Sequence, residues 1–432
     1  MKEVKFKFFE LDNGNYAVFP VGNHVEKSII ITNQIGREIC DNICTQTKEE
    51  IIEMLSQKYN VSKETLYVDL QDFMKKLDDI LYCKTEDTLI ENALQISEKD
   101  TSLSQLLVYN HYKRKIPYNV FLELTYNCNL RCPHCYLQND LTSTNKYISK
   151  EMVFRIVDEL EGVEAVNITF TGGEATLHPD IIEILQYASS KNILVTLLTN
   201  GQLITDDMLN QLVHIPLYDI RVSLYGTEQQ HDSFVKKPGA FAQVKKVLSF
   251  LQAKKGIGEA TFIMTTQNHM SFMEVVKEFE RVNVPVNFSG MILPTADGDL
   301  KPTQFRITDK ETLKKIYRDS GIALSGSECT AGVCRFRITP TGDVNPCEMM
   351  HHVVFGNLHK QSFSDILKSD VHMEWLEFFD KLKKEHNCGK CENKKWCSFC
   401  PGLFYEETGS YDTPSPYTCM ITQIKKELML NE

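Results

Sequence analysis

Six short apolar segments, separated by amphipathic stretches, dominate the middle of the chain. They are NVFLELT, VNITFTGG, LVTLLTN, DIRVSLYG, ATFIMTT and VNFSGMI, between residues 119 and 292. Helical periodicity lies between them, as in SKEMVFRIVDELEG and DIIEILQYASS. Near-continuous apolar strands that alternate with helices predict an α/β fold with a parallel sheet. Six units are fewer than a closed eight-fold barrel needs, so we expect an open, partial (β/α)6 barrel.

Unusual residues follow the ends of the first four predicted strands. The segment ELTYNCNLRCPHCYL follows the first strand and contains Cys128, Cys132 and Cys135. TGGE at 171–174, TNG at 199–201 and SLYG at 223–226 end the next three strands. The carboxyl ends of parallel strands in such folds meet at one rim, where ligands bind. We therefore expect these residues to form one site.

The 432 residues are too many for one core, so two or three domains are expected. Residues 1–83 show three short strands and three helices, which predicts a winged-helix-like α+β domain, with a T-x-x-E capping box at Thr47 and Glu50. Residues 84–118 are predicted to be a linker. The barrel is predicted to occupy 119–310, and a cysteine-rich domain 311–432.

Charge and hydrophobicity restrict the cellular setting. The net charge is −11 and the pI is near 5.6, which disfavours a nucleic-acid partner. The start of the chain has no signal-peptide core, and no apolar stretch is long enough for a membrane span. We expect a cytoplasmic protein. Fourteen cysteines in a compartment where stable disulfides are uncommon indicate metal binding.

The three cysteines after the first strand have three possible roles: disulfides, a zinc site that lacks a ligand, or ligands of an iron–sulfur cluster. His134 lies in the same loop but is too close to its neighbours for comfortable tetrahedral zinc geometry. A [4Fe–4S] cluster normally takes four thiolates, so three leave one iron open to another ligand. The spacing CxxxCxxC favours the cluster.

CxxxCxxC after the first strand of a partial barrel, with GGE after the second, resembles the radical S-adenosylmethionine (SAM) superfamily. In that family the open iron chelates SAM, whose reductive cleavage gives a 5′-deoxyadenosyl radical that abstracts hydrogen. The resemblance implies that the cluster ligands are Cys128, Cys132 and Cys135. It implies that the SAM contacts are Tyr136, Gly172, Gly173, Glu174, Asn200, Ser223 and Ile292. Ser223 as an ordinary strand-end hydroxyl and Ile292 as a core residue are the alternatives.

One position departs from the family pattern. Many relatives with His-Asp after the fourth strand place an arginine three residues beyond the Asp, where it pairs with the carboxylate of SAM. This chain has His231 and Asp232 but Val235 at that place. Lys236 or Lys237 could substitute, or the role could be absent. No residue can be assigned as a general base from the sequence.

The tail contains eight cysteines at spacings that resemble the SPASM extension, which carries two auxiliary [4Fe–4S] clusters. The resemblance implies one set of ligands at Cys329, Cys334, Cys347 and Cys400, and a second set at Cys388, Cys391, Cys397 and Cys419. The pair Cys397 and Cys400 is separated by two residues, against three in the commonest pattern. If one cluster keeps an open site, Cys329 or Cys334 is the non-ligand. Zinc is the alternative, because C-x2-C-x5-C-x2-C alone could bind it.

The first 83 residues resemble the leader-peptide recognition element of ribosomally made peptide natural products, whose relative is the small chaperone of pyrroloquinoline quinone biosynthesis. An exposed sheet edge beside a helix can take an extended peptide as an added strand. The predicted peptide contacts are Ser28, Ile29, Ile30, Ile31, Leu66, Leu70, Phe73 and Leu77. A DNA-binding winged helix is the rival, but the third helix is acidic on its exposed face.

Together these three parts resemble the sactipeptide and ranthipeptide synthases of the subtilosin type, which are oxidoreductases acting on a peptide. The resemblance implies a thioether between a cysteine sulfur and a carbon of a precursor peptide that carries an N-terminal leader. It implies SAM and three [4Fe–4S] clusters as cofactors, and a flavodoxin or ferredoxin as reductant. The alternatives are a peptide epimerase, a carbon–carbon crosslinking enzyme, a sulfatase-maturing-type protein modifier, and a non-enzymatic electron-transfer scaffold that binds peptides.

Overall fold

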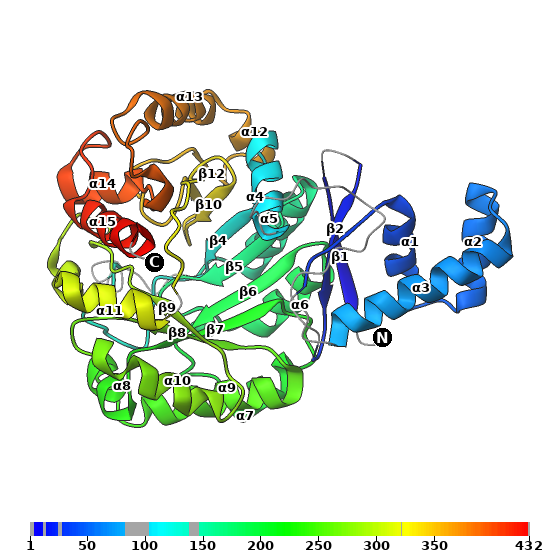
Figure 1. The fold of residues 1–432 in the computed structure, drawn as a ribbon, viewed down its shortest axis with the longest axis horizontal. Helices are drawn as coiled ribbons and strands as arrows, with labels where there is room; N and C mark the ends of the chain where they lie inside the picture. Colours follow the sequence, from blue (N-terminus) through cyan, green and yellow to red (C-terminus); the bar gives the residue numbers. More distant parts are fainter. Residues whose placement is uncertain are drawn as a thin grey trace.

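The computed structural model describes residues 4–11, 14–24, 28–82, 103–137, 147–320 and 322–430. In this part of the chain a three-stranded sheet and a nine-stranded sheet organise the fold. Figure 1 shows the small sheet, in blue, on one side of the larger one, and the tail helices, in orange and red, near its other end. The α/β class and the parallel sheet are as predicted.

The front unit (residues 4–82) contains the small sheet and the first three helices. Its elements are β1 (Lys5–Glu10), β2 (Tyr16–Val21), β3 (Ile30–Thr32), α1 (Gln34–Asn42), α2 (Lys48–Tyr59) and α3 (Lys63–Tyr82). The strands are antiparallel in the order β1-β2-β3. The capping box is present, because Glu50 accepts from the Thr47 N–H at 2.7 Å and Thr47 accepts from the Glu50 N–H. β3 begins at Ile30, two residues later than the predicted 28–31.

All six predicted strands of the barrel are present, each shorter than its apolar segment. They are β4 (Asn119–Glu123), β5 (Asn167–Thr171), β6 (Leu194–Thr199), β7 (Asp219–Leu224), β8 (Glu259–Ile263) and β9 (Val286–Ser289). They pair in parallel and in chain order, as in a barrel and unlike a doubly wound sheet. The prediction of a partial barrel is confirmed.

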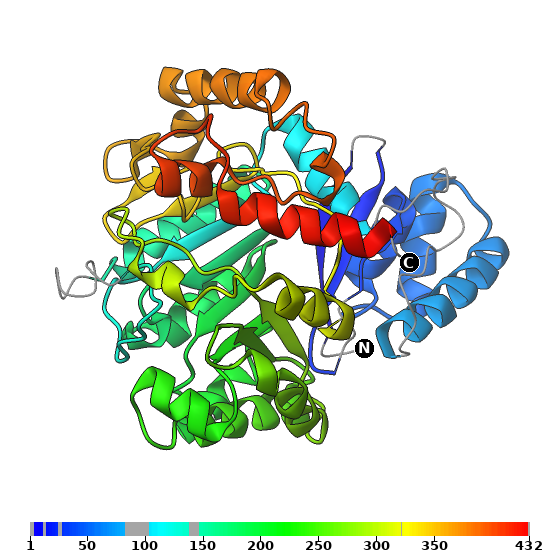
Figure 2. The same ribbon diagram turned by 60° about the vertical axis from the view of Figure 1, so that its left-hand side comes forward.

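One helix before these strands and the helices between and after them surround the sheet. They are α4 (Leu103–Arg114), α5 (Lys150–Gly162), α6 (Ile181–Ser190), α7 (Asp206–Leu212), α8 (Glu228–Val235), α9 (Ala240–Lys255), α10 (Phe272–Glu280), α11 (Lys310–Ser320), α12 (Phe363–Leu367), α13 (Asp370–Glu385), α14 (Pro401–Thr408) and α15 (Pro416–Leu430). α4 lies in the predicted linker, of which residues 84–102 are outside the described residues. α15 packs on α11 (Figure 2). Within the described ranges no helix is both long enough and apolar enough to cross a membrane.

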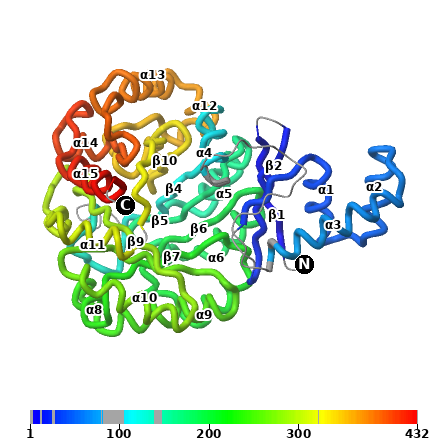
Figure 3. Tube along the Cα trace, in the orientation of Figure 1, coloured from blue at the N-terminus to red at the C-terminus, as the bar shows by residue number. Residues whose placement is uncertain are grey.

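The tail continues the barrel sheet, which the sequence did not predict. Its strands are β10 (Arg335–Ile338), β11 (Asp343–Asn345) and β12 (Gly356–Asn357). β10 pairs in parallel with β4, so that Arg337 lies opposite Phe121. Figure 3 shows β10 beside β4. One outer edge of the six-stranded array is therefore covered by the tail, while β9 remains at the other end of the sheet.

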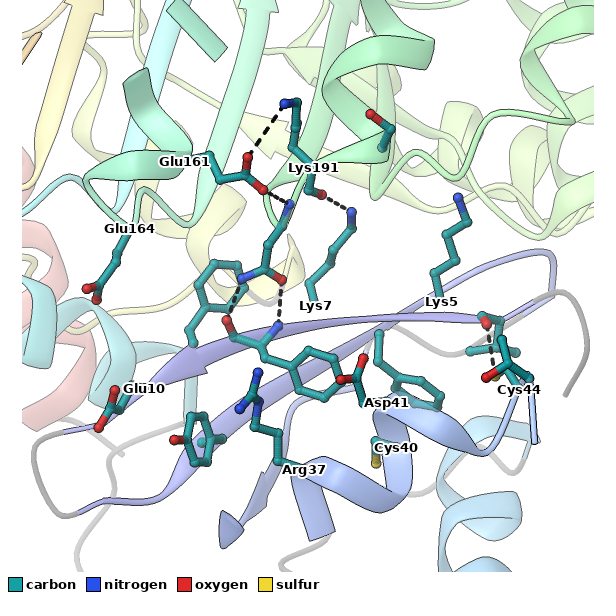
Figure 4. Close-up of a pocket in the computed structure, with 18 of the residues that line it drawn as sticks. Lys5, Lys7, Glu10, Arg37, Cys40, Asp41, Cys44, Glu161, Glu164 and Lys191 are labelled. Carbon is teal, nitrogen blue, oxygen red and sulfur yellow. Dashed lines mark hydrogen bonds and ion pairs between the residues drawn. The ribbon is translucent and has the colours of Figure 1, made fainter. Parts of the chain in front are cut away.

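The front unit contacts the barrel through the outer edge of β1. The Asn192 side chain accepts from the Phe8 N–H at 2.9 Å and donates to the Phe8 carbonyl at 2.7 Å. The ammonium group of Lys7 donates to the carbonyls of Ser189 and Lys191 (Figure 4). Burial lowers the pKa of Lys7 to about 8. The barrel thus uses the backbone groups with which β1 would otherwise pair to another strand.

Candidate cluster and cofactor site

The loop with the three cysteines starts where β4 ends and lies across the end of β5. The Gly173 N–H donates to the Thr125 carbonyl at 2.8 Å, and the Glu174 N–H donates to the Asn127 carbonyl at 2.8 Å. These bonds fix the first half of the loop on the TGGE segment. The two motifs that the sequence placed at one rim are in direct contact.

Gly172 and Gly173 are required by this contact. Gly172 has φ +124°, a conformation that side-chain-bearing residues rarely adopt. A Cβ on Gly172 would overlap the Thr125 carbonyl oxygen, and one on Gly173 would overlap the carbonyl oxygens of Tyr126 and Asn127. A side chain at either position would push the cysteine loop away from β5. Close approach of these glycines to SAM stays a prediction.

The Glu174 carboxylate ties the ends of β5 and β6 together. One of its oxygens accepts from the Thr176 N–H, the Thr176 hydroxyl and the Thr199 hydroxyl at 2.6–3.0 Å. The other accepts from the Asn200 N–H at 2.7 Å. Four donors match the roughly four acceptor sites of a carboxylate, so Glu174 is satisfied within the protein. Its predicted contact with the ammonium group of SAM stays a prediction.

Asn200 continues this chain of contacts to the cysteine loop. Its amide donates to the Asn129 side chain at 2.8 Å and lies 3.9 Å from the Cys128 sulfur. The Leu130 N–H donates to the same sulfur at 3.4 Å. The predicted SAM residues Glu174 and Asn200 are therefore connected to a predicted cluster ligand.

The three thiols of the loop lie close to one another. Burial, and then the charges of Cys135 and Cys128, raise the pKa of Cys132 to about 12. Burial also raises the pKa of Cys128. Three neighbouring sulfur donors fit an iron–sulfur cluster with one iron left open. In the described residues, no group of three or more His, Cys, Asp or Glu side chains is already close enough to hold a single metal ion.

An apolar wall lies beside these thiols. Leu130, Tyr225, Phe234, Val235 and Ile292 are buried together and pack against Cys128 and Cys132. Ile292 therefore belongs to the apolar cluster that packs against two cysteines of the loop. Ser223 lies beside the Tyr225 hydroxyl. Their contacts with SAM stay predictions.

The tail cysteines form two neighbourhoods. Burial, and then the charge of Cys347, raise the pKa of Cys329 to about 12. Burial, and then the charge of Cys329, raise the pKa of Cys400 to about 12. Burial also raises the Cys334 pKa to about 12, but the groups that act on it are Thr330, Lys383 and Arg335. None of the groups that shift the Cys334 pKa is another cysteine. Which of Cys329 and Cys334 is a non-ligand stays a prediction.

The second neighbourhood contains the other four tail cysteines. Burial raises the pKa of Cys388 to about 11, and the charges of Cys419, Cys397 and Cys391 raise it further. Cys397 and Cys391 also raise the pKa of Cys419. Cys391 and Cys419 are exposed, so this neighbourhood lies at the surface.

Comparisons with known families match all three parts of the chain. Residues 122–282 match the Radical SAM superfamily, and residues 329–398 match SPASM, an iron–sulfur cluster-binding domain. Residues 23–80 match Coenzyme PQQ synthesis protein D (PqqD). The chain is a radical SAM enzyme with SPASM and PqqD domains. These domains imply SAM with a [4Fe–4S] cluster, and auxiliary clusters in the tail.

The similar proteins differ in their named activities. An AdoMet-dependent heme synthase of Methanosarcina barkeri is 26% identical over 343 residues, which covers 70% of this chain and 96% of that protein. The antilisterial bacteriocin subtilosin biosynthesis protein AlbA of Bacillus subtilis is 27% identical over 307 residues, 66% of this chain and 67% of that protein. Streptococcus suis SuiB bound to precursor peptide SuiA has a TM-score of 0.61 at 14% identity, and covers 97% of this chain and 99% of that one. The SuiB likeness shows the fold.

The His-Asp pair of the radical SAM domain has a structural role here. His231 is buried and accepts from the Tyr225 N–H at 3.2 Å, and burial lowers its pKa to about 4. The Asp232 carboxylate accepts from the Phe241 N–H at 2.8 Å, in the first turn of α9. Val235, where many relatives have arginine, is part of the apolar wall. Lys236 is exposed at the end of α8, and no described contact connects it to the cysteine loop.

A buried polar network between the barrel and the SPASM domain was missed by the sequence reasoning. Arg337 on β10 donates to the Glu123 carboxylate at 2.6 Å and to the Tyr126 hydroxyl at 3.1 Å. Its other terminal nitrogen contacts Asn345 at 3.2 Å and His351 at 2.8 Å. Arg337 and Glu123 are each 1% exposed. The segment RFRI gave no signal for this, because alternating arginines are typical of a strand with one solvated face.

Tyr136 belongs to the same network. Its hydroxyl donates to the Glu123 carboxylate at 3.4 Å, and its ring centroid lies 6.2 Å from that of His351. Burial raises the pKa of Tyr136 well above its usual value. Tyr126 and Tyr136 flank the three cysteines, so the network holds both ends of the loop. The predicted contact of Tyr136 with adenine stays a prediction.

Proposed function

We propose that this radical SAM enzyme installs a thioether crosslink, joining a cysteine sulfur to a carbon, in a ribosomally made precursor peptide. The observation that carries the proposal is the PqqD domain in the same chain as the radical SAM and SPASM domains. The relatives include a heme synthase, so the PqqD domain is what favours a peptide substrate. A bacteriocin biosynthesis protein among the relatives supports the same choice.

The leader would bind at the free edge of the front sheet. The barrel occupies the outer edge of β1 through Asn192, which leaves β3 as the other outer strand. A leader strand would pair with the backbone near Ser28 and Ile30, because the side chains of Ile29, Ile30 and Ile31 are buried. This is strand addition, and it raises the local concentration of the core peptide at the rim.

The predicted helical contacts of the leader need one adjustment. Leu66, Leu70 and Leu77 are buried in the core of the front unit, and Phe73 is packed against it. α3 instead exposes Tyr67, at 47%, and Val68, at 65%. A leader beside α3 would therefore meet Tyr67 and Val68 first, and would reach the four predicted residues through a movement of the helix.

At the rim, residues of the chain would bind the first cluster and SAM, and they would exclude water from them. Cys128, Cys132 and Cys135 would hold the first cluster, with Glu174 and Asn200 next to it. Leu130, Tyr225 and Phe234 form an apolar wall that keeps water from the reacting groups. When bound, SAM and the clusters supply hydrogen abstraction and accept the surplus electron. The crosslink removes one hydrogen from the thiol and one from the carbon.

The same proposal includes the domain boundaries, the cellular compartment and the reductant. The proposed domains are residues 1–83, 84–118, 119–310 and 311–432. The thiol-rich chain suits the reducing cytoplasm, and a flavodoxin or ferredoxin is the proposed reductant.

The test is a single-turnover reaction with a candidate precursor, a short cysteine-containing peptide to be sought among the reading frames beside the gene. Anaerobic, reduced enzyme with SAM should give a product lighter by two hydrogen atoms per bond, together with 5′-deoxyadenosine. Cys128→Ala should abolish both products. Cys40→Ala is the matched control, since Cys40 lies in the front unit and should leave both products unchanged.

Alkylation of free thiols separates the alternatives. A thioether product loses one alkylatable cysteine per bond. A carbon–carbon crosslink gives the same mass loss with all thiols still alkylatable, and an epimerase gives an unchanged mass. Either of these results contradicts the thioether proposal.

A further inference from the structure

A cavity of about 310 Å³ separates the β9 end of the barrel from the SPASM domain. Its walls come from the ends of β8 and β9, from α11 and from α14 and α15. Apolar side chains dominate them, among them Met264, Phe288, Met291, Ile292, Leu313, Ile316, Leu403 and Ile421. Small-molecule sites start at about this volume, which is enough for one or two amino-acid residues.

Arg306 is a buried cation in this apolar lining. It is 7% exposed, and its Nε donates to the Ile292 carbonyl at 2.8 Å. Its Nη1 donates to the Glu407 carboxylate at 2.6 Å, and the guanidinium lies 4.7 Å from the centre of the Tyr417 ring. Its Nη2 is buried and has no hydrogen-bond partner among the described residues. An unsatisfied buried donor is costly, and a ligand oxygen would remove that cost.

Lys425 is a second buried cation in the lining. It is 7% exposed, and the hydrogen bond given to its ammonium group is a 3.3 Å contact with the Ser325 carbonyl. Burial lowers its pKa. Two buried cations in an apolar cavity indicate a ligand with an apolar body and an acceptor oxygen.

The cavity borders the first neighbourhood of tail cysteines at one residue. Of the predicted auxiliary ligands, Cys400 lines it, whereas Cys329 and Cys347 do not. Ile292 lines it as well and belongs to the apolar cluster against which Cys128 and Cys132 pack. The cavity thus extends from the wall beside the SAM rim to the first neighbourhood of tail cysteines.

We propose that this cavity binds an apolar residue of the substrate peptide, whose carbonyl or carboxylate oxygen accepts a hydrogen bond from Arg306 Nη2. The naming of a peptide as the ligand rests on the proposed function, while the chemistry of the ligand follows from the lining. A residue held here lies between the rim and Cys400. The cavity then selects peptides with an apolar residue at a fixed distance from the modified carbon.

Photo-crosslinking of the cluster-loaded, full-length enzyme tests this. The probes are N-acetyl-photoleucine amide and N-acetyl-photoleucine, whose diazirine group labels what it touches on irradiation. Digestion and mass spectrometry should place adducts on α11 and α15. Excess N-acetyl-leucine amide should suppress them, and N-acetyl-glycine amide should not. Stronger labelling by the amide indicates an internal residue of the peptide, and stronger labelling by the free acid indicates its carboxyl terminus.

Two variants test the two parts of the site. Ile421→Trp fills the cavity and should remove the adducts, whereas Met270→Trp, at an exposed position, should not. Arg306→Lys keeps a cation beside Glu407 but removes the planar second donor. It should lower labelling roughly tenfold, the usual effect of losing one good hydrogen bond to a charged group.

Adducts spread over exposed positions, or adducts that survive both Ile421→Trp and Arg306→Lys, overturn the inference. Its failure differs from that of the proposed function. Loss of cavity labelling with a correctly crosslinked precursor peptide refutes the cavity assignment alone. Cavity labelling with no modified peptide refutes the proposed function alone.

Discussion

Two buried arginine–glutamate pairs connect the barrel region to the SPASM domain, and they differ in what surrounds them. Arg337 and Glu123 are enclosed by Tyr126, Asn345 and His351. Arg306 and Glu407 are equally close, at 2.6 Å, but Arg306 lines a cavity. Each arginine leaves one nitrogen without a described partner, Nε in Arg337 and Nη2 in Arg306.

The difference distinguishes an ion pair with a structural role from an ion pair that can take part in ligand binding. Around Arg337 the partners come from β4, the cysteine loop, β11 and the segment after it, so that pair holds the loop in place. Arg306 lines the cavity, and its remaining donor, Nη2, is buried without a partner among the described residues. A buried ion pair can therefore stabilise an interface when protein groups surround it. It can provide part of a binding site when its arginine lines a cavity.

The largest expected effect is at the enclosed pair. Arg337→Met leaves Glu123 buried and without its cation, which should lower the free energy of unfolding by about 3–5 kcal/mol. Urea midpoints compared at a common m value measure this. The double variant Arg337→Met with Glu123→Gln should recover part of the loss, because no charge is stranded. Equal losses in both variants would show that the pair is not the source.

The same substitution in the Arg306–Glu407 pair tests the comparison between the two ion pairs. Arg306→Met leaves Glu407 without its cation, and the Glu407 side chain is 10% exposed against 1% for Glu123. Water can reach Glu407 more easily, so the loss should be smaller than at Arg337. A larger loss at Arg306 would contradict the assignment of the two pairs.

An intermediate effect on the free energy of unfolding is expected from the titration of His351. Burial, and then the charge of Arg337, lower the pKa of His351 to about 3. An unfolded histidine has a pKa of about 6.5, so between these values the unfolded chain binds a proton that the folded chain does not. Stability should therefore fall as the pH falls from 6.5 toward 3, with Glu348 opposing and His352 adding to the shift.

His351→Asn checks this pH effect. Asparagine can still accept from Arg337 but does not titrate, so about 1–2 kcal/mol of the stability lost between pH 7 and pH 5 should disappear. The measurement is the urea midpoint at the two pH values. His359→Asn, at an exposed position, is the control and should keep the full dependence. An unchanged slope in His351→Asn would place a charged histidine in the network.

The smallest change in the free energy of unfolding is expected for Lys425→Met. Lys425 has one long hydrogen bond, to the Ser325 carbonyl, and methionine can fill the space of its stem. Replacing a poorly paired buried cation by an apolar side chain should change the free energy of unfolding by less than about 1 kcal/mol, or stabilise slightly. A loss as large as that of Arg306→Met would mean that Lys425 belongs to an enclosed network.

The sequence predicted the elements whose signal is local. The six apolar segments and the T-x-x-E box at Thr47 were found because periodicity and capping depend on near neighbours. The meeting of TGGE with the cysteine loop followed from the rule that parallel strands end at one rim. These signals needed no knowledge of distant residues.

The rest depends on partners far apart in the chain. The pairing of β10 with β4 joins residues 216 positions apart, such as Arg335 and Asn119, and the Arg337–Glu123 contact joins residues 214 positions apart. A four-residue strand does not specify such a partner. The stripe of Leu66, Leu70 and Leu77 was visible as periodicity. Periodicity shows which residues share a face but not what covers that face, and here it is the core of the front unit.

The parallel pairing of β10 with β4 has a consequence for biosynthesis. During translation, β4 leaves the ribosome long before β10 is made, so its edge carries unpaired N–H and C=O groups until the last quarter of the chain arrives. The contacts of Arg337 with Glu123 and Tyr126 cannot form before then. A chain truncated before β10 would leave the edge of β4 unpaired, where another chain could add a strand.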